Sequence, residues 1–278
     1  RESLDESPNP IGMSGIEFVE YATSKPQALG QVLELMGFRL AARHRSREVM
    51  LYRQGGINLI VNAHEATEES PSIAAVAFRV RDAANAYRRA LDSGAWAVHT
   101  QVEVMELNIP AIHGVGDSRI YFVDRHKDFS IYDVDFIPVP SVQHDQDSKI
   151  ELNAFGLVQY IGNDRTEDWT EFYSALFGFQ TLPDDLRFGI LPKGRILKSP
   201  CGQFHIQLIE PEPTVLDLQE DEHFHRLGLS TQHVLDTVKH LEKRGVEFVD
   251  SAHLHTAERG ALTCTWLHSV SFELVHKD

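Results

Sequence analysis

Residues 15–41 read GIEFVEYATSKPQALGQVLELMGFRLA, and this stretch contains the pattern from which the whole chain is built. Residues 15–21 form an apolar run that predicts a strand, and residues 26–36 carry apolar side chains at the spacing of an amphipathic helix. Gly37 follows the helix, where glycine adopts a left-handed conformation without a Cβ clash. A further strand follows at once, at residues 38–41. The stretch therefore predicts a strand–helix–strand unit closed by later strands.

The same order of strand, helix, glycine and strand recurs three more times along the chain. First strands are expected at residues 15–21, 73–80, 154–161 and 227–230, helices at 26–36, 83–91, 169–177 and 234–243, and helix-ending glycines at Gly37, Gly94, Gly178 and Gly245. Asp82 is expected to cap the second helix, and strands at 119–123 and 129–134 to close the second unit. The sequence thus predicts an α+β fold of four βαβββ modules, arranged as two pseudo-symmetric halves.

A polar, proline-containing segment separates these halves. We expect an N-terminal half at residues 1–139, with modules 1 and 2, and a C-terminal half at residues 152–278, with modules 3 and 4. Residues 140–151 are interpreted as the linker between them.

The composition excludes several classes of protein. Of 278 residues, 41 are Asp or Glu and 26 are Lys or Arg, giving a net charge of −15 that opposes nucleic-acid binding. No apolar run approaches the ~20 residues of a membrane-spanning helix, and the polar N-terminus does not resemble a secretory signal. The two cysteines, Cys201 and Cys264, are expected to be reduced thiols of a cytoplasmic protein. Because the first residue is Arg1, we expect a processed, trimmed or excised chain.

Several segments of the first half resemble one enzyme family closely. They are residues 9–22 (NPIGMSGIEFVEYA), 44–60 (HRSREVMLYRQGGINLI), 77–82 (AFRVRD), 120–125 (IYFVDR) and 130–136 (SIYDVDF). In this order they are similar to the N-terminal half of bacterial 4-hydroxyphenylpyruvate dioxygenases, members of the vicinal-oxygen-chelate (glyoxalase/bleomycin resistance) superfamily. The resemblance implies mixed sheets that curl into cups, homo-oligomers, and a small aromatic or 2-oxo acid ligand. It also implies that the N-terminal half carries no catalytic metal.

The resemblance places the chemistry of aromatic metabolism in the C-terminal half. There the family holds Fe(II) with two His and one Glu, leaving positions open for a 2-oxo acid and dioxygen. Glu273 matches the ligand Glu, but Arg226 falls where the second His is expected, and Phe155 or Gly156 falls where the first is expected. The family's insertion before its last strands is largely absent, and the chain ends at Asp278 before the family's covering helix.

Other residues could complete a metal site in this cup. Overlaying residues 203–207 on 271–275 pairs His205 with Glu273, and His225 could supply a third ligand if the strand register slips by one residue. Such a site would hold Fe(II) or another divalent metal; otherwise the cup binds no metal. Arg226 could form a structural ion pair with Glu273 or bind a substrate carboxylate.

Three hypotheses for function follow. The first is an Fe(II)-dependent dioxygenase of the family, acting on a 2-oxo acid. The second is a non-catalytic or structural dioxygenase-like domain, in the manner of those joined to dehydroshikimate dehydratases. The third is another metal-dependent lyase or isomerase that uses the same cup.

Overall fold

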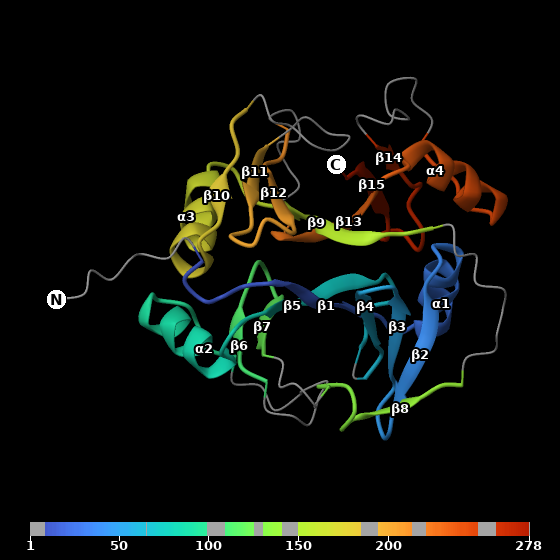
Figure 1. The fold of residues 1–278 in the computed structure, drawn as a ribbon, viewed down its shortest axis with the longest axis horizontal. Helices are drawn as coiled ribbons and strands as arrows, with labels where there is room; N and C mark the ends of the chain where they lie inside the picture. The colour runs from blue at the N-terminus through green and yellow to red at the C-terminus, as the bar shows by residue number, and fades with distance from the viewer. Residues whose placement is uncertain are drawn as a thin grey trace.

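The computed structural model describes residues 9–64, 66–98, 109–124, 130–140, 150–184, 194–212, 221–249 and 260–277. Over these residues the chain forms two mixed β-sheets that lie one above the other, with a pair of helices at each end (Figure 1). The predicted α+β fold of two pseudo-symmetric halves is therefore confirmed.

The N-terminal half supplies the first sheet. Its elements are β1 (Gly15–Ala22), α1 (Pro26–Leu35), β2 (Arg39–His44), β3 (Val49–Gln54), β4 (Ile57–Asn62), β5 (Ser72–Arg79), α2 (Ala83–Asp92), β6 (Ala111–His113), β7 (Arg119–Val123) and β8 (Phe136–Pro138). The strand order is β6-β7-β5-β1-β4-β3-β2-β8.

The C-terminal half supplies the second sheet. Its elements are β9 (Asn153–Tyr160), α3 (Thr166–Phe177), β10 (Gln180–Thr181), β11 (Arg195–Lys198), β12 (His205–Ile209), β13 (His223–Thr231), α4 (Val234–Lys243), β14 (Ala261–Leu262) and β15 (Phe272–His276). The strand order is β10-β11-β12-β9-β13-β15-β14. Most of the predicted linker, residues 141–149, lies outside the described residues, and the division of the chain into domains stays a prediction.

The internal repeat is visible in how the central strands pair. β1 runs parallel to β4 and antiparallel to β5, and β5 runs parallel to β7. In the second sheet β9 runs parallel to β12 and antiparallel to β13, and β13 runs parallel to β15. Each half therefore presents a cup-like face built from four equivalent strands.

One apolar core lies between the two sheets and joins the halves. The Phe78 ring of β5 lies 5.3 Å from the Phe177 ring at the end of α3 and 5.5 Å from the ring of Phe204. A second core fills the outer face of the first sheet with aromatic side chains, among them Phe18 and Tyr121, whose rings lie 5.7 Å apart. Because strand side chains alternate between faces, Phe18 belongs to the outer core and Val19 to the shared one. The N-terminal cup is thus filled by its own side chains.

Two local predictions have opposite outcomes. The carboxylate of Asp82 accepts a hydrogen bond from the backbone of Asn85 at 3.0 Å, so the predicted cap of α2 is confirmed. The strand predicted at 129–134 is wrong over its described residues, because residues 131–135 form a turn and β8 begins at Phe136. No helix in the described part of the chain is long and apolar enough to cross a membrane.

Candidate functional site in the C-terminal cup

The centre of the second sheet carries a row of four residues, one on each of four neighbouring strands. His205 of β12 pairs with Gly156 of β9, Gly156 with Gly228 of β13, and Gly228 with Glu273 of β15. Because the two glycines have no side chains, the floor of the cup is open between the side chains of His205 and Glu273. All four residues line a cavity of about 20 Å³, which has room for about one water molecule.

Gly156 cannot carry a side chain in this backbone. A Cβ atom there would overlap the carbonyl oxygen of His205 on the neighbouring strand. Because that neighbour is backbone rather than a flexible side chain, a strand would have to shift. A histidine at the first ligand position expected from the family therefore does not fit at Gly156.

Arg226 and Glu273 form a buried ion pair beside this row. Arg226 Nε donates to Glu273 Oε2 at 3.3 Å, and the two residues are 3% and 4% exposed. The buried Nη2 atom of Arg226 has no hydrogen-bond partner among the described residues. A guanidinium group has five donors and no acceptor, so it cannot ligate a metal. Its positive charge lies where the family resemblance expects a ligand imidazole.

His205 lies on the opposite flank of the cup, and its ring stacks on Phe155 with centroids 4.7 Å apart. Burial and the nearby positive charge of Lys198 lower the pKa of His205 to about 4, although a hydrogen bond with the Phe155 backbone acts in the opposite direction. The ring is therefore neutral at pH 7.

This shift predicts how stability depends on pH. Because the folded pKa of His205 lies below the unfolded value of about 6.5, the unfolded chain binds the extra proton between these two values. The free energy of unfolding should therefore fall as pH drops from about 6.5 to 4, with a slope from this residue of up to about 1.4 kcal/mol per pH unit. Urea unfolding between pH 7 and 4.5 should show a shallower slope for His205→Leu than for the parent. The exposed His113 provides the control His113→Leu, which should keep the parent slope; equal slopes in all three proteins would refute the assignment.

His225 lies elsewhere, at the border between the two halves. Its ring stacks on Tyr160 with centroids 4.0 Å apart, and its Nδ1 lies 3.1 Å from Nε2 of His223. Burial, followed by the charges of His223 and Arg226, lowers the pKa of His225 to about 4. Instead of the cup, it lines a pocket of about 390 Å³ together with Tyr21 of β1. The structure thus brings His205 and Glu273 to one cavity and places His225 on another.

The described residues do not fit the family's iron site. Within the described ranges, no group of three or more His, Cys, Asp or Glu side chains is arranged to hold a metal ion. Glu273 is engaged by Arg226, and Gly156 offers no ligand atom. The metal-ligand roles of Glu273, His205 and His225 stay predictions.

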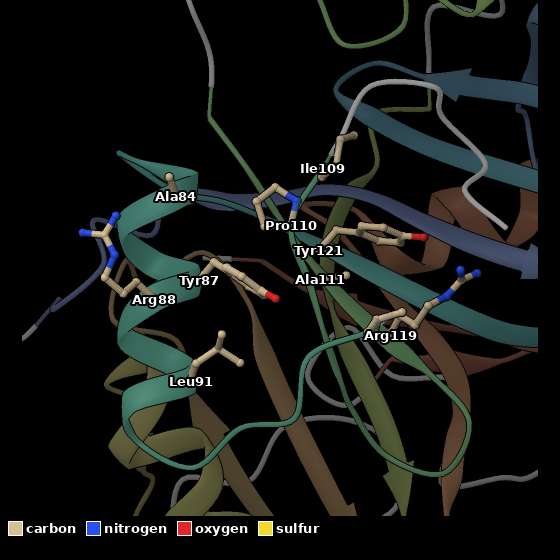
Figure 2. Close-up of a pocket in the computed structure, with 10 residues that line it drawn as sticks. Ala84, Tyr87, Arg88, Leu91, Ile109, Pro110, Ala111, Arg119 and Tyr121 are labelled. Carbon is tan, nitrogen blue, oxygen red and sulfur yellow. The ribbon is translucent and has the colours of Figure 1, made fainter. Parts of the chain in front are cut away.

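A larger pocket of about 530 Å³ lies in the N-terminal half, between α2 and the strands β6 and β7 (Figure 2). The Tyr87 side chain points from α2 into the space between the helix and the strands (Figure 2). The guanidinium of Arg119 lies 5.5 Å from the Tyr121 ring centroid and pairs with the buried Glu20 at 3.2 Å. Burial raises the pKa of Glu20 against the lowering effect of Arg119. The signal for this pocket in the sequence is the alternation along β7, which puts Arg119 and Tyr121 on one face of the strand.

Comparisons with known proteins agree with this architecture. The family model described as hydroxyphenylpyruvate dioxygenase, HPPD, N-terminal, matches residues 7–137. The model of the glyoxalase/bleomycin resistance protein/dioxygenase superfamily matches residues 156–265. The fold and cup therefore define a protein of the glyoxalase and dioxygenase class.

Similar proteins narrow the class to one family. The chain is 35% identical to hemolysin VllY of Vibrio vulnificus over 268 residues, which are 87% of this chain and 73% of that protein. It is also 35% identical to the 4-hydroxyphenylpyruvate dioxygenase of Pseudomonas sp. strain P.J. 874 over 265 residues, 87% of this chain and 72% of that one. The chain belongs to the 4-hydroxyphenylpyruvate dioxygenase family.

Three further comparisons concern larger proteins and the fold. The chain is 35% identical over 226 residues to a 3-dehydroshikimate dehydratase of Pseudomonas aeruginosa, covering 74% of this chain and 34% of the dehydratase. Among solved structures, a xylose isomerase-like TIM barrel/4-hydroxyphenylpyruvate dioxygenase fusion protein matches with a TM-score of 0.74 and 23% identity, covering 99% of this chain and 51% of that one. A mutant 4-hydroxymandelate synthase from Streptomyces coelicolor matches with a TM-score of 0.73 and 18% identity, covering 96% and 93%. These structural matches show the fold.

Proposed function

We propose that this chain is a member of the 4-hydroxyphenylpyruvate dioxygenase family that does not oxidise a 2-oxo acid with Fe(II) and serves as a non-catalytic dioxygenase-like domain. The observation that carries the proposal is the buried ion pair between Arg226 and Glu273. An Fe(II) facial triad needs three ligands and open positions for substrate and dioxygen. Arg226 places a fixed positive charge where a metal ligand is expected. It also pairs with Glu273, the one carboxylate ligand expected from the family.

The partner we propose is a separate catalytic domain of the dehydratase type, fused to this chain or bound to it. This proposal is supported by the 3-dehydroshikimate dehydratase of P. aeruginosa, of which the matched region is about a third. The family resemblance further suggests a homo-oligomer, which supports a scaffolding role. Size-exclusion chromatography with light scattering tests the oligomeric state, and a monomer at micromolar concentration contradicts it.

Metal loading and oxygen uptake test the loss of iron chemistry. The protein is incubated anaerobically with Fe(II), desalted and analysed for iron, and oxygen consumption is then followed with 4-hydroxyphenylpyruvate. We expect far less than one iron per chain and no uptake above the protein-free rate. One tightly held iron per chain together with substrate-dependent oxygen uptake would overturn the proposal.

A single substitution should change the ligand chemistry of the cup. Arg226→His places an imidazole beside Glu273 and removes the guanidinium that engages it. We therefore expect at least about a tenfold gain in affinity for Zn²⁺, the usual partner of imidazole and carboxylate ligands. Calorimetric titration of Zn²⁺ measures it, and Arg226→Lys, which keeps a cation, is the matched control. Equal Zn²⁺ affinity in the two variants contradicts the proposed geometry of the cup.

A lyase or isomerase that uses another divalent metal is the second candidate, because His205 and Glu273 line one cavity. The same metal analysis distinguishes the non-catalytic domain from the lyase or isomerase. A stoichiometric divalent metal other than iron, lost together with stability on adding a chelator, favours the lyase or isomerase.

A further inference from the structure

The pocket at the border of the halves has walls from both of them. Its volume is about 390 Å³, within the usual range of small-molecule sites. The N-terminal half contributes Tyr21 and Ile73, and the C-terminal half contributes Phe224, His225 and Val270. Ser269 of the C-terminal half donates a hydrogen bond to the carbonyl of Pro71, which fixes one edge of the pocket across the border. Apolar atoms make up most of the accessible wall, and the polar groups among them come from Glu68 and from several serines and histidines.

Hydrogen bonding fixes the protonation pattern of two histidines at this pocket. Nδ1 of His223 lies 2.7 Å from the carbonyl oxygen of Asp221, which can only accept, so Nδ1 carries the hydrogen. In neutral His223 the Nε2 atom is then an acceptor, and Nδ1 of His225 donates to it at 3.1 Å. The Nε2 atom of neutral His225 therefore keeps a lone pair, and no hydrogen bond in the described part of the chain uses it. This chain of hydrogen bonds orients His225 as an acceptor for a bound donor.

The buried side chain of Tyr21 forms part of the pocket wall. Tyr21 lines the pocket and is 3% exposed, and its hydroxyl has no hydrogen-bond partner among the described residues. A buried hydroxyl without a partner is costly, and buried polar groups are nearly always satisfied. Because the hydroxyl oxygen is itself closed to solvent, a ligand in the pocket would contact other atoms of Tyr21.

The charges around the pocket select an uncharged ligand. Among the described residues that line it, Glu68 is acidic and none is Lys or Arg. A carboxylate would have no fixed cation to pair with and would meet Glu68. The pocket is therefore unsuited to a 2-oxo acid, whose anion would instead need a site with a guanidinium group.

We propose that this border pocket binds a small uncharged molecule with an apolar body and a hydroxyl group that donates to Nε2 of His225. Phenol is the simplest such compound. Its ring is apolar, like the side chains of Ile73, Phe224 and Val270 in the wall, and its acidic hydroxyl is a stronger donor than an alkyl alcohol. The site does not depend on the loss of iron chemistry in the cup, because it shares no residue with the Arg226–Glu273 pair.

Titration with phenol tests the site. Imidazole nitrogen shifts of the ¹⁵N-histidine-labelled full chain are followed, and phenol is expected to move the Nε2 resonance of His225 in a saturable way, whereas benzoate at the same concentrations is not. His225→Phe keeps a ring against Tyr160 but lacks the acceptor, and it should weaken phenol binding at least about tenfold, measured through ligand-observed NMR. Exposed His113 provides the control His113→Phe, which should bind phenol like the parent.

Tyr21→Phe provides a second variant, because it removes one unpartnered oxygen and keeps the ring. It should fold with unchanged or higher thermal stability and bind phenol like the parent, because the hydroxyl that it removes is closed to the pocket. Unsaturable shifts with phenol, equal effects of phenol and benzoate, or undiminished binding by His225→Phe would each overturn the proposal.

Discussion

Replacing Arg226 with leucine is expected to lower the free energy of unfolding by about 3–5 kcal/mol, the usual cost of removing one partner of a buried ion pair. Arg226 and Glu273 are 3% and 4% exposed, so the Glu273 carboxylate would keep its burial and lose its cation. Water in the adjacent cavity cannot replace the guanidinium, because that cavity has room for about one molecule. Urea unfolding at pH 7, followed by circular dichroism, measures the loss.

The control for this prediction is an exposed ion pair of the same chain. Lys25 and Glu69 lie 3.1 Å apart with side chains 55% and 73% exposed. Lys25→Leu should cost no more than about 1 kcal/mol, because water screens the exposed pair. The double variant Arg226→Leu/Glu273→Leu should recover much of the stability lost by the single one, since no buried charge remains. A single Arg226→Leu variant as stable as the parent would show that the pair does not hold the cup together.

The fold could be predicted because its signals are local. The apolar strand, amphipathic helix and helix-ending glycine recur in all four units, and Gly178 indeed ends α3 with a φ of +83°. The strand predicted at residues 129–134 was wrong for an equally local reason, which the residue types alone do not reveal. The Ser130 hydroxyl accepts from the backbone of Tyr132, and the Asp133 amide donates to the carbonyl of Ser130. These bonds favour a turn over a ladder.

The candidate site was less predictable, because it depends on strand register and on packing between halves. Arg226 and Glu273, for which an ion pair was one of two sequence-based alternatives, lie 3.3 Å apart in the structure. A register shift between Phe224 and Arg226 directs His225 to the border pocket, and the sequence carries no signal for such a bulge. Tyr21 and His225 line one pocket although they belong to different halves, and no periodic pattern relates them.

The Gly156→Ala variant is expected to be destabilised by about 3 kcal/mol, at the upper end of the cost of overpacking. The new Cβ atom would overlap the carbonyl oxygen of His205, which belongs to the paired strand β12. Relief requires β9 and β12 to separate, which weakens ladder hydrogen bonds at the centre of the sheet. Thermal and urea unfolding of the variant measure the effect, and hydrogen exchange should localise the weakened bonds to β9 and β12.

Gly228 is the matched control, because it lies directly opposite Gly156 in the same row of the sheet. A Cβ atom on Gly228 would lie 3.4 Å or more from its neighbours, which is ordinary van der Waals contact. Gly228→Ala should therefore stay within about 1 kcal/mol of the parent, with the reduced entropy of the unfolded chain acting in its favour. If the two variants are equally stable, the backbone of β9 can move, and Gly156 no longer excludes the family's first ligand. If Gly156→Ala alone is destabilised, recovery of the ligand would need a change in strand geometry as well as in sequence.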